Sequence, residues 1–361
     1  MNETLSGFIE RVTYHNPENG FAVLRVKVRG RAELVTIVGN TTSVTAGEHV
    51  KAEGRANGTR ATFTYDEAGN LTRLANVTSS DIIISTFDYS YDNVGNRTSV
   101  IEKDDRVTWT YDNTYQLRRE QRDGTNKYDI THTYDAAGNR LTRLDRDYSP
   151  TPLPAARTTY TCDAANQLET CKATGNVTTF AYDADGNLFT KNNQAAGVTT
   201  YTWDEENRLD ELNAAGTSYT FTYNADGKRM RSSELFDMVA LWDGENLLEH
   251  TKGLLVLHLH TYEPGTFGPA VSLQLLPAIS NKAGYFHFDG LGSVDQITKD
   301  TEVVDAAYLY EAFGTLKLDE SSETLNRQKF VGALGLSHDR LLDRRDQLVR
   351  QSSCVGNRTN M

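Results

Sequence analysis

The sequence has few cysteines, which limits how it can be cross-linked. Only three of its 361 residues are cysteines, Cys162, Cys171 and Cys354. Three thiols are too few for a disulfide framework, and no CxxC zinc motif occurs. Cys162 and Cys171 could pair across one hairpin, but two free thiols are the simpler expectation.

Long apolar segments are also absent. The longest apolar run, Leu254 to Leu257, is far too short to cross a bilayer. The start, MNETLSGFIERV, lacks the basic and apolar regions of a secretory signal peptide. We therefore expect a soluble chain or fragment that is made in the cytoplasm. Its final compartment is unknown, and export by a dedicated secretion system stays open.

The common catalytic motifs are missing as well. A GxxxxGK[ST] phosphate loop at Gly227-Lys228 would need Gly in place of Thr222 and Ser or Thr in place of Arg229. No such loop occurs, so ATP hydrolysis is excluded. There is no GxSxG elbow, and neither Cys162 nor Cys171 has a motif-level histidine partner. We predict no catalytic, cofactor-binding or metal-binding residues and a protein that is not an enzyme.

What the sequence does contain favours strands and tight turns. It has 18 tyrosines and 27 glycines against only 38% hydrophobic residues. The net charge of −12 argues against nucleic-acid or anionic-membrane binding by the chain as a whole. The first 54 residues are neutral, with six acids and six bases, so all of the acidic excess lies after them. This asymmetry indicates two unlike parts.

A degenerate repeat dominates the centre of the chain. Four units begin with Tyr-Asp and reach Gly-Asn three residues later, at Tyr65, Asp66, Gly69, Asn70; Tyr91, Asp92, Gly95, Asn96; Tyr134, Asp135, Gly138, Asn139; and Tyr182, Asp183, Gly186, Asn187. Variant units begin at Tyr111, Cys162, Trp203 and Tyr223, and successive starts are 20 to 28 residues apart. An Asp two to four residues before Gly or Asn makes an Asx turn, with Gly in the left-handed conformation. Because one unit buries little by itself, stability must come from stacked neighbours.

The units alternate roughly between a Gly-Asn form and an Asn/Gln-Leu form. This alternation predicts a structural period nearer forty residues than twenty, with two hairpin-like segments per period and with the Tyr or Trp of each unit stacked on its neighbour.

The predicted fold class is all-β, with a small N-terminal OB-like barrel followed by a curved sheet of stacked hairpins that forms an incomplete shell. We place a β-module at 1–54, the repeat array at 55–230, further β-hairpins at 231–338 and a charged, partly disordered tail at 339–361. Residues 24–28 of the first module alternate between apolar and basic, the period of a half-buried strand.

The candidate nucleic-acid contacts lie in that first module. Arg25, Lys27, Arg29 and Arg31 share one strand face and could follow a single-stranded backbone, with Tyr14 or Phe21 for stacking. The simpler alternative is a solvated outer face, because the module has no net charge.

Two weaker candidate sites for metal ions have simpler explanations. His258 and His260 share a strand face and would need a third ligand such as His250 or Glu263, whereas strand-surface histidines are common. Asp183 to Asn187 is similar to a calcium loop but has Leu188 where that loop requires Gly, which favours turn chemistry.

The repeated YDxxGN units resemble the RHS/YD-repeat family, and so does YFHFDGLGSVDQITKDTEVVDAAYLYEAFG. The resemblance covers about residues 58–338. It implies a β-sheet shell that encloses a C-terminal toxin, or an extracellular contact surface, and sugar binding is also attributed to such repeats. The family's cleavage motif and toxin domain do not follow FVGALGLSHD here, so we expect a truncation or frame shift near Arg340.

Residues 3–54, from ETLSGFIERV to VKAEG, resemble the OB-like domain of RecD-type DNA helicases. Four functions follow from these resemblances. The first is a non-catalytic scaffold, part of a toxin-encapsulating or cell-contact protein. The others are nucleic-acid binding through the N-terminal module, carbohydrate binding on the repeat surface, and a truncated or chimeric product without selected function. The expected partners are a toxin or other protein, a carbohydrate, or single-stranded nucleic acid.

Overall fold

The computed structural model describes residues 2–15, 21–29, 34–40, 45–55, 58–102, 105–148, 153–233, 238–243, 246–252, 255–262, 270–275 and 282–321. Within these ranges every regular element is a β-strand, so the all-β prediction is confirmed. No helix in this described part is long and apolar enough to span a membrane. The predicted tail at 339–361 lies outside the described residues.

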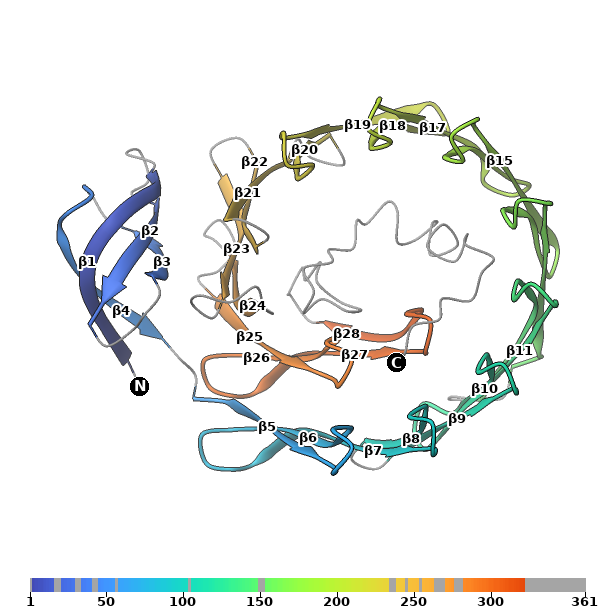
Figure 1. Cartoon of the computed structure of the whole chain (residues 1–361), viewed down its shortest axis with the longest axis horizontal. Coiled ribbons are helices and arrows are strands. Elements are labelled where there is room, and N and C mark those ends of the chain that lie inside the picture. The colour runs from blue at the N-terminus through green and yellow to red at the C-terminus, as the bar shows by residue number, and fades with distance from the viewer. Residues whose placement is uncertain are drawn as a thin grey trace.

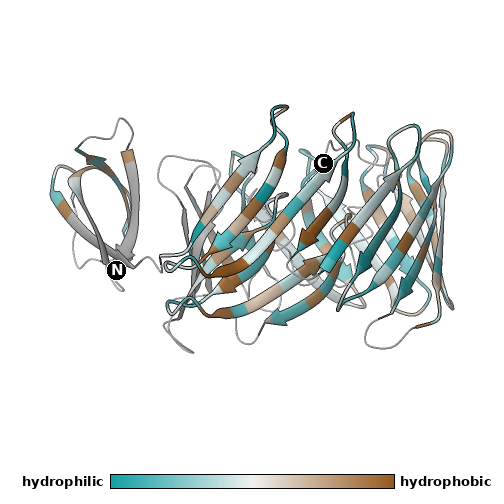
Figure 2. Ribbon diagram, turned by 90° about the horizontal axis from the view of Figure 1, so that it is seen from below, coloured by the Kyte–Doolittle hydropathy of each residue, from teal (hydrophilic) through white to brown (hydrophobic). Residues whose placement is uncertain are grey.

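The N-terminal module is a four-stranded antiparallel sheet, and it lies beside the larger sheet in both views (Figures 1 and 2). Ile9, Ala22, Leu24 and Val26 form its buried core. Lys27 is exposed between buried Val26 and half-buried Val28, as the alternating pattern predicts. In sheet order, its strands are β3 (Leu34–Asn40), β2 (Phe21–Val28), β1 (Asn2–His15) and β4 (His49–Arg55).

The larger sheet contains twenty-four strands in chain order. Its first twelve are β5 (Arg60–Tyr65), β6 (Leu71–Val77), β7 (Ile83–Tyr91), β8 (Arg97–Glu102), β9 (Asp105–Tyr111), β10 (Leu117–Asp123), β11 (Tyr128–Tyr134), β12 (Arg140–Asp147), β13 (Ala156–Cys162), β14 (Leu168–Ala173), β15 (Asn176–Tyr182) and β16 (Leu188–Asn193). The remaining twelve are β17 (Gly197–Trp203), β18 (Leu209–Ala214), β19 (Thr217–Tyr223), β20 (Arg229–Ser232), β21 (Met238–Asp243), β22 (Asn246–Lys252), β23 (Leu255–Tyr262), β24 (Ala270–Leu275), β25 (Lys282–Phe288), β26 (Val294–Thr298), β27 (Val304–Tyr310) and β28 (Leu316–Ser321).

Each repeat unit forms one hairpin, and the hairpins follow one another around a ring (Figure 1). The register between the two strands shifts beside the aromatic residue that precedes each turn, for example at Tyr65, Tyr91 and Tyr182. Such bulges bend a strand and increase its twist. A bulge repeated in every hairpin therefore curves the whole sheet, and the predicted curved, hairpin-stacked architecture is confirmed.

The end of the sheet returns to its beginning. Strands β25–β28 lie on the inner side of β6–β12 (Figure 1), and hydrogen bonds join the two layers. We call this contact between β25–β28 and β6–β12 the overlap seam. Strands β13–β19, which lie opposite it in the ring, are the single wall.

The seam identifies the concave face of the sheet. Arg143 on β12 contacts Glu311, which follows β27, so the side chain of Arg143 points inward. Arg143 pairs with Thr158 on β13, and Tyr160 lies two residues further along the same face. The concave face of the single wall carries one buried cluster, made of Tyr160, Leu168, Cys171, Phe180, Leu188, Tyr201, Leu212 and Phe221. Its convex face carries threonines, including the hydrogen-bonded pair Thr161 and Thr170.

Candidate functional site

The Tyr-Asp … Gly-Asn units form one recurrent turn. In the first unit, Asp66 Oδ1 accepts hydrogen bonds from the backbone N–H groups of Ala68 and Asn70, at 3.0 and 2.8 Å. Its Oδ2 accepts another from the Asn70 amide, at 3.0 Å. This side-chain hydrogen bond from Asn70 is the main cause of the lowered pKa of Asp66. The same bonds recur at Asp92, Asp135 and Asp183. All four carboxylates therefore serve their own turns.

The variant units keep this turn. The third residue after the turn acid has a positive φ in both forms of the unit. It is a glycine in the Gly-Asn form, as at Gly69 and Gly186, and an asparagine in the variant form, as at Asn166 and Asn207. Because Asn tolerates the left-handed conformation, both forms build the same hairpin. The backbone period is therefore one hairpin of about twenty residues, and the forty-residue interpretation is wrong for the backbone.

A forty-residue period survives only in side-chain hydrogen bonds between neighbouring turns. The amide of Asn139 donates to Asn166 Oδ1 at 2.8 Å, and that of Asn187 donates to Asn207 Oδ1 at 2.7 Å. Each bond links a Gly-Asn turn to the Asn-type turn that follows it.

The aromatic residue at each turn fastens its hairpin to the preceding one. The Tyr182 hydroxyl donates to the carbonyl of Leu168 at 3.0 Å, and the Trp203 indole donates to that of Leu188 at 2.9 Å. Hydroxyl and indole groups both donate, which explains why Trp replaces Tyr. Equivalent bonds are made by Tyr91, Tyr111, Tyr134, Tyr223, Trp242 and Tyr310. A directional clamp that was not predicted from the sequence thus joins neighbouring units, whereas stacking of one unit's Tyr or Trp on the next stays a prediction.

A second aromatic residue lies two positions before the Tyr or Trp of each unit, and it was not predicted from the sequence. Phe180, Tyr201 and Phe221 occupy it in the single wall and are buried. His132 occupies it in the overlap seam, where its ring meets Phe313 edge-on at 5.2 Å. Aligning the units two residues upstream of each Tyr would have shown this aromatic-x-Tyr-Asp pattern.

The overlap seam contains two clusters of charged groups, and the first surrounds Glu120. Both Glu120 carboxylate oxygens accept from the Ala312 N–H, at 3.1 and 2.9 Å, and Oε1 also accepts from the Tyr128 hydroxyl at 2.9 Å. Beside it Arg143 makes two bonds to Glu311, at 2.5 and 2.6 Å. Burial and the nearby charge of Glu311 raise the pKa of Glu120 to about 7, against the hydrogen bonds that it accepts.

Other charged groups complete this first cluster. Arg143 also contacts Asp145 at 2.5 Å, and Lys317 on β28 lies 3.4 Å from the same carboxylate. Burial alone would lower the pKa of Arg143, but the charges of Glu311 and Asp145 outweigh it and raise the pKa. Burial lowers the pKa of His132 to about 3, with help from Arg140 and Arg143, so this histidine is neutral.

The second cluster brings Asp289 and Asp295 of the inner layer against the outer layer. Arg122 bonds to Glu102 at 2.5 Å and to Asp105 at 2.8 Å. Burial raises the pKa of Asp289 to about 6 and that of Asp295 to about 8. The Tyr89 hydroxyl accepts from Gly290 N–H at 2.8 Å, and Arg97 donates to the Gly290 carbonyl at 3.0 Å. Backbone and side-chain groups together hold the two layers in register.

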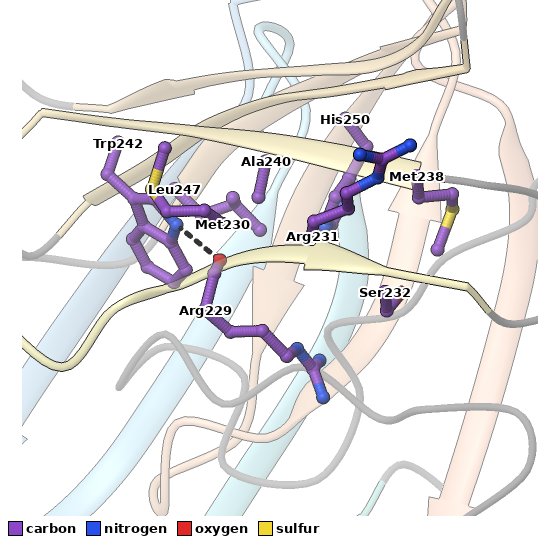
Figure 3. Close-up of a pocket in the computed structure, with 9 residues that line it drawn as sticks. All are labelled: Arg229, Met230, Arg231, Ser232, Met238, Ala240, Trp242, Leu247 and His250. Carbon is purple, nitrogen blue, oxygen red and sulfur yellow. Dashed lines mark hydrogen bonds between the residues drawn. The ribbon is translucent and has the colours of Figure 1, made fainter. Parts of the chain in front are cut away.

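A small cavity lies between β20, β21 and β22 (Figure 3). Its volume of about 20 Å³ suits a single water molecule and no organic ligand. Trp242 lies at one end, with its indole donating to the Arg229 carbonyl at 3.0 Å, and His250 and Met238 line the other. A larger open hollow of about 630 Å³ lies between the first two repeat turns, but its carboxylates, Asp66 and Asp92, already bind their own turns.

The predicted basic strand is present in the N-terminal module. Lys27 and Arg29 are exposed and Arg25 is half-buried, whereas Arg31 lies outside the described residues. Lys27 pairs with Phe8 on β1, which pairs with His49 on β4. Phe8 is 60% exposed and meets the His49 ring edge-on at 5.0 Å. The side chains of the predicted stacking residues, Tyr14 and Phe21, are not among the described ones. The ring pair of Phe8 and His49 was not predicted from the sequence.

Of the two histidines considered as a metal site, only His260 has a described side chain. His260 is buried against Phe286, with the rings 6.3 Å apart, while the side chain of His258 and all of Glu263 lie outside the described residues. In the described part of the chain no three His, Cys, Asp or Glu side chains gather closely enough to bind a metal ion.

The two neighbouring cysteines do not pair with each other. Cys171 is a buried free thiol opposite Tyr160, whereas Cys162 pairs in register with Leu168 and is not a free thiol, so the expectation of two free thiols is wrong for Cys162. Burial raises the pKa of the Cys171 thiol, which makes it a poor nucleophile.

Residues 2–59 match the family model of the OB-fold domain of the ATP-dependent DNA helicase YrrC. A comparison with the curated proteins returns no match. Among solved structures, the Tc holotoxin pore of Photorhabdus luminescens, with a point variant of TccC3, is 17% identical, at a TM-score of 0.51. That match covers 84% of this chain and 16% of the other.

Two further structures are similar. The TcdB2-TccC3-Cdc42 and TcdB2-TccC3-TEV crystal structures are each 16% identical, with TM-scores of 0.54 and 0.53. Each match covers 87% of this chain and 17% of the other, so the chain spans about one-sixth of the structures it matches. The N-terminal residues are thus similar to a YrrC-type OB-fold domain, and the rest of the described chain has the fold of the RHS-type β-sheet shell in these Tc toxin structures.

Proposed function

We propose that this chain is a non-catalytic scaffold, one segment of the wall of a toxin-encapsulating or cell-contact protein. The observation that supports this role best is the continuous curved sheet, in which each hairpin is clamped to the next and the last hairpins dock on the first. Its repeated carboxylates are occupied by their own turns, which leaves little for acid–base chemistry. The similar structures carry toxin names, and their greater length implies that other segments supply the rest of such a wall.

The concave face suits contact with another polypeptide. On the single wall most of its buried side chains are aromatic or aliphatic, with Thr178 and Lys191 among them, whereas the convex face is rich in threonine. Apolar surface on one side of a sheet favours burial against a chain on that side. We propose that the enclosed partner packs against this concave face.

A client-protection experiment tests the scaffold role. The full chain would be mixed with a permanently unfolded, fluorescently labelled polypeptide, and the protease resistance of the label would be followed. We expect protection by the natural chain, a large loss with Tyr219→Lys at a half-buried position of the concave face, and no change with its exposed convex neighbour Thr220→Lys. Thermal melts would establish that both variants fold. No protection, or equal loss in both folded variants, would refute the proposal.

Nucleic-acid binding by the N-terminal module is a second candidate, favoured by a specific surface. Phe8 and His49 form an exposed aromatic pair beside Lys27, with Arg25 and Arg11 paired further along the same two strands. Stacking rings next to basic side chains is the arrangement by which OB-folds hold single strands.

Fluorescence anisotropy with a labelled oligo-thymidine and the full chain tests this candidate. We expect binding at low salt that weakens steeply as salt increases. Phe8→Ala and Lys27→Gln should each reduce the affinity, whereas Lys172→Gln, at an exposed position of β14, should not. The absence of binding at low salt, or an equal loss in the control, would remove the candidate.

Carbohydrate binding and a chimeric product without selected function stay predictions. The repeat tyrosine hydroxyls are already bonded to backbone carbonyls, so a sugar would have to use the remaining ring surface. A glycan array with Tyr→Ala variants addresses the first, and a cooperative melt of a monodisperse species addresses the second.

A further inference from the structure

The overlap seam has more carboxyl groups than cations. In the cluster around Asp295, four carboxyls face two arginines. Asp289 and Asp295 come from the inner layer, and Glu102 and Asp105 come from the outer layer with Arg97 and Arg122. Protonation of two of the four carboxyls would make this cluster neutral.

The cluster around Glu120 has the same imbalance. Glu120, Glu311 and Asp145 face Arg143 and Lys317, so one proton on Glu120 balances the charge. Glu120 and Glu311 are both 2% exposed, and burying an uncompensated charge costs several kcal/mol. Charge balance and burial thus both favour a protonated acid in the docked state.

We propose that the overlap seam is a proton-controlled latch, closed when Glu120 and Asp295 hold protons and loosened when they ionise. The latch concerns how the inner hairpins β25–β28 stay docked, and it does not depend on what the sheet encloses. It would allow the wall to open at its overlap while the single wall stays folded.

In the described part of the chain, titratable and charged groups from several strands surround Glu120. They are Tyr111 on β9, Arg122 on its own strand, Tyr128 and His132 on β11, Arg143 and Asp145 on β12, Glu311 after β27 and Lys317 on β28, with Arg140 of β12 on the far side of His132. Asp295 faces Ser85 on β7, Glu102 on β8, Arg122 on β10, Asp289 in the turn before its own strand and Tyr310 on β27.

The direction of the pH dependence follows from these carboxyls. Burial raises the pKa of Glu120 to about 7 in the docked state, above its ordinary value of 4.5. The docked state therefore binds more protons, and its extra stability is present below pH 4.5 and is lost as pH rises through 7. Asp295 extends the loss toward pH 8. His132 is neutral when docked and opposes docking only below about 6.5, so the carboxyls dominate above neutrality.

Hydrogen exchange of the full chain at pH 6.5 and 8.5 tests the latch, with rates corrected for intrinsic exchange at each pH. We expect amides of β27 and β28 to exchange at least about tenfold faster at the higher pH, because ionisation of Glu120 and Asp295 together removes docking free energy. Amides of β15 and β16 in the single wall should not change and serve as the internal reference.

Variants that mimic the protonated acid should remove the effect. We expect Glu120→Gln and Asp295→Asn each to reduce the response to pH, and the double variant to keep β27 and β28 protected at pH 8.5. Glu169→Gln on exposed β14 is the control and should behave as the natural chain. The latch is refuted if β27 and β28 show no pH dependence, if the single wall loosens equally, or if both neutral variants keep the natural response.

Discussion

The single wall and the overlap seam are built from the same hairpin, yet they bury different chemistry. Eight residues after the turn acid, the wall has Cys171, Leu212 and one cation, Lys191, whereas the seam has Leu74 and Val100 but also both Glu120 and Arg143 at the same repeat position. In the wall the concave face is an apolar cluster along one layer of strands. In the seam the same face is covered by a second layer and is linked to it by hydrogen bonds and ion pairs.

This difference indicates how one part of a repeat sheet can be directed to dock on another. Apolar contacts hold neighbouring hairpins together but do not specify which distant hairpin is to be covered. Buried polar groups are specific, because a misplaced partner leaves them unpaired at high cost. We propose that the charges of the seam determine where the inner layer docks, at some expense of stability.

The largest effect should come from removing the central cation of the seam. Arg143→Met would leave Glu311 and Asp145 without their buried partner, and we expect a loss of about 3 to 5 kcal/mol. Chemical denaturation would measure the loss, and hydrogen exchange would locate it in β27 and β28. Arg157→Met on exposed β13 is the matched control. A uniform loss over the single wall would contradict the distinction between the two regions.

A smaller effect is expected from crowding the seam at a glycine. A Cβ on Gly290 would lie 2.6 Å from the Tyr89 hydroxyl and 2.8 Å from its ring carbons, closer than van der Waals contact allows. We expect Gly290→Ala to cost about 1 to 3 kcal/mol through displacement of the inner layer.

A double-mutant cycle separates this clash from a general effect of alanine. The shorter side chain of Tyr89→Leu should make room, so Gly290→Ala should cost less in that background. Equal losses in both backgrounds, measured by denaturation, would show that the two residues do not compete for space.

Much of the hairpin structure could be predicted from the sequence because its determinants are local. Asp66 and Asn70, or Asp183 and Asn187, lie within one turn and bond to each other, so a short motif reports the structure. Alternation in residues 24–28 likewise predicted a strand with Leu24 and Val26 inside. The aromatic residue two positions before each Tyr is equally local, so the same repeat carries the signal that predicts it.

The seam could not be predicted in this way. Arg143 and Glu311 are 168 residues apart, and Glu120 and Ala312 are 192 apart. Their pairing depends on how far each hairpin turns the sheet, a small angle summed over many units. Glu120 also interrupts an apolar repeat position, which in a single sequence is indistinguishable from a surface charge.

The smallest effect concerns the aromatic clamp, which a Tyr or Trp makes in eight of the described hairpins. Tyr182 donates to the Leu168 carbonyl, whereas Tyr65 has no earlier hairpin in the sheet and is 59% exposed. Tyr182→Phe should therefore cost about 0.5 to 1.5 kcal/mol, because the part-buried carbonyl loses its donor. Tyr65→Phe should cost nothing measurable by denaturation. If the two variants lose stability equally, the hydroxyl is not what fastens one hairpin to the next, and ring packing alone must hold the wall together.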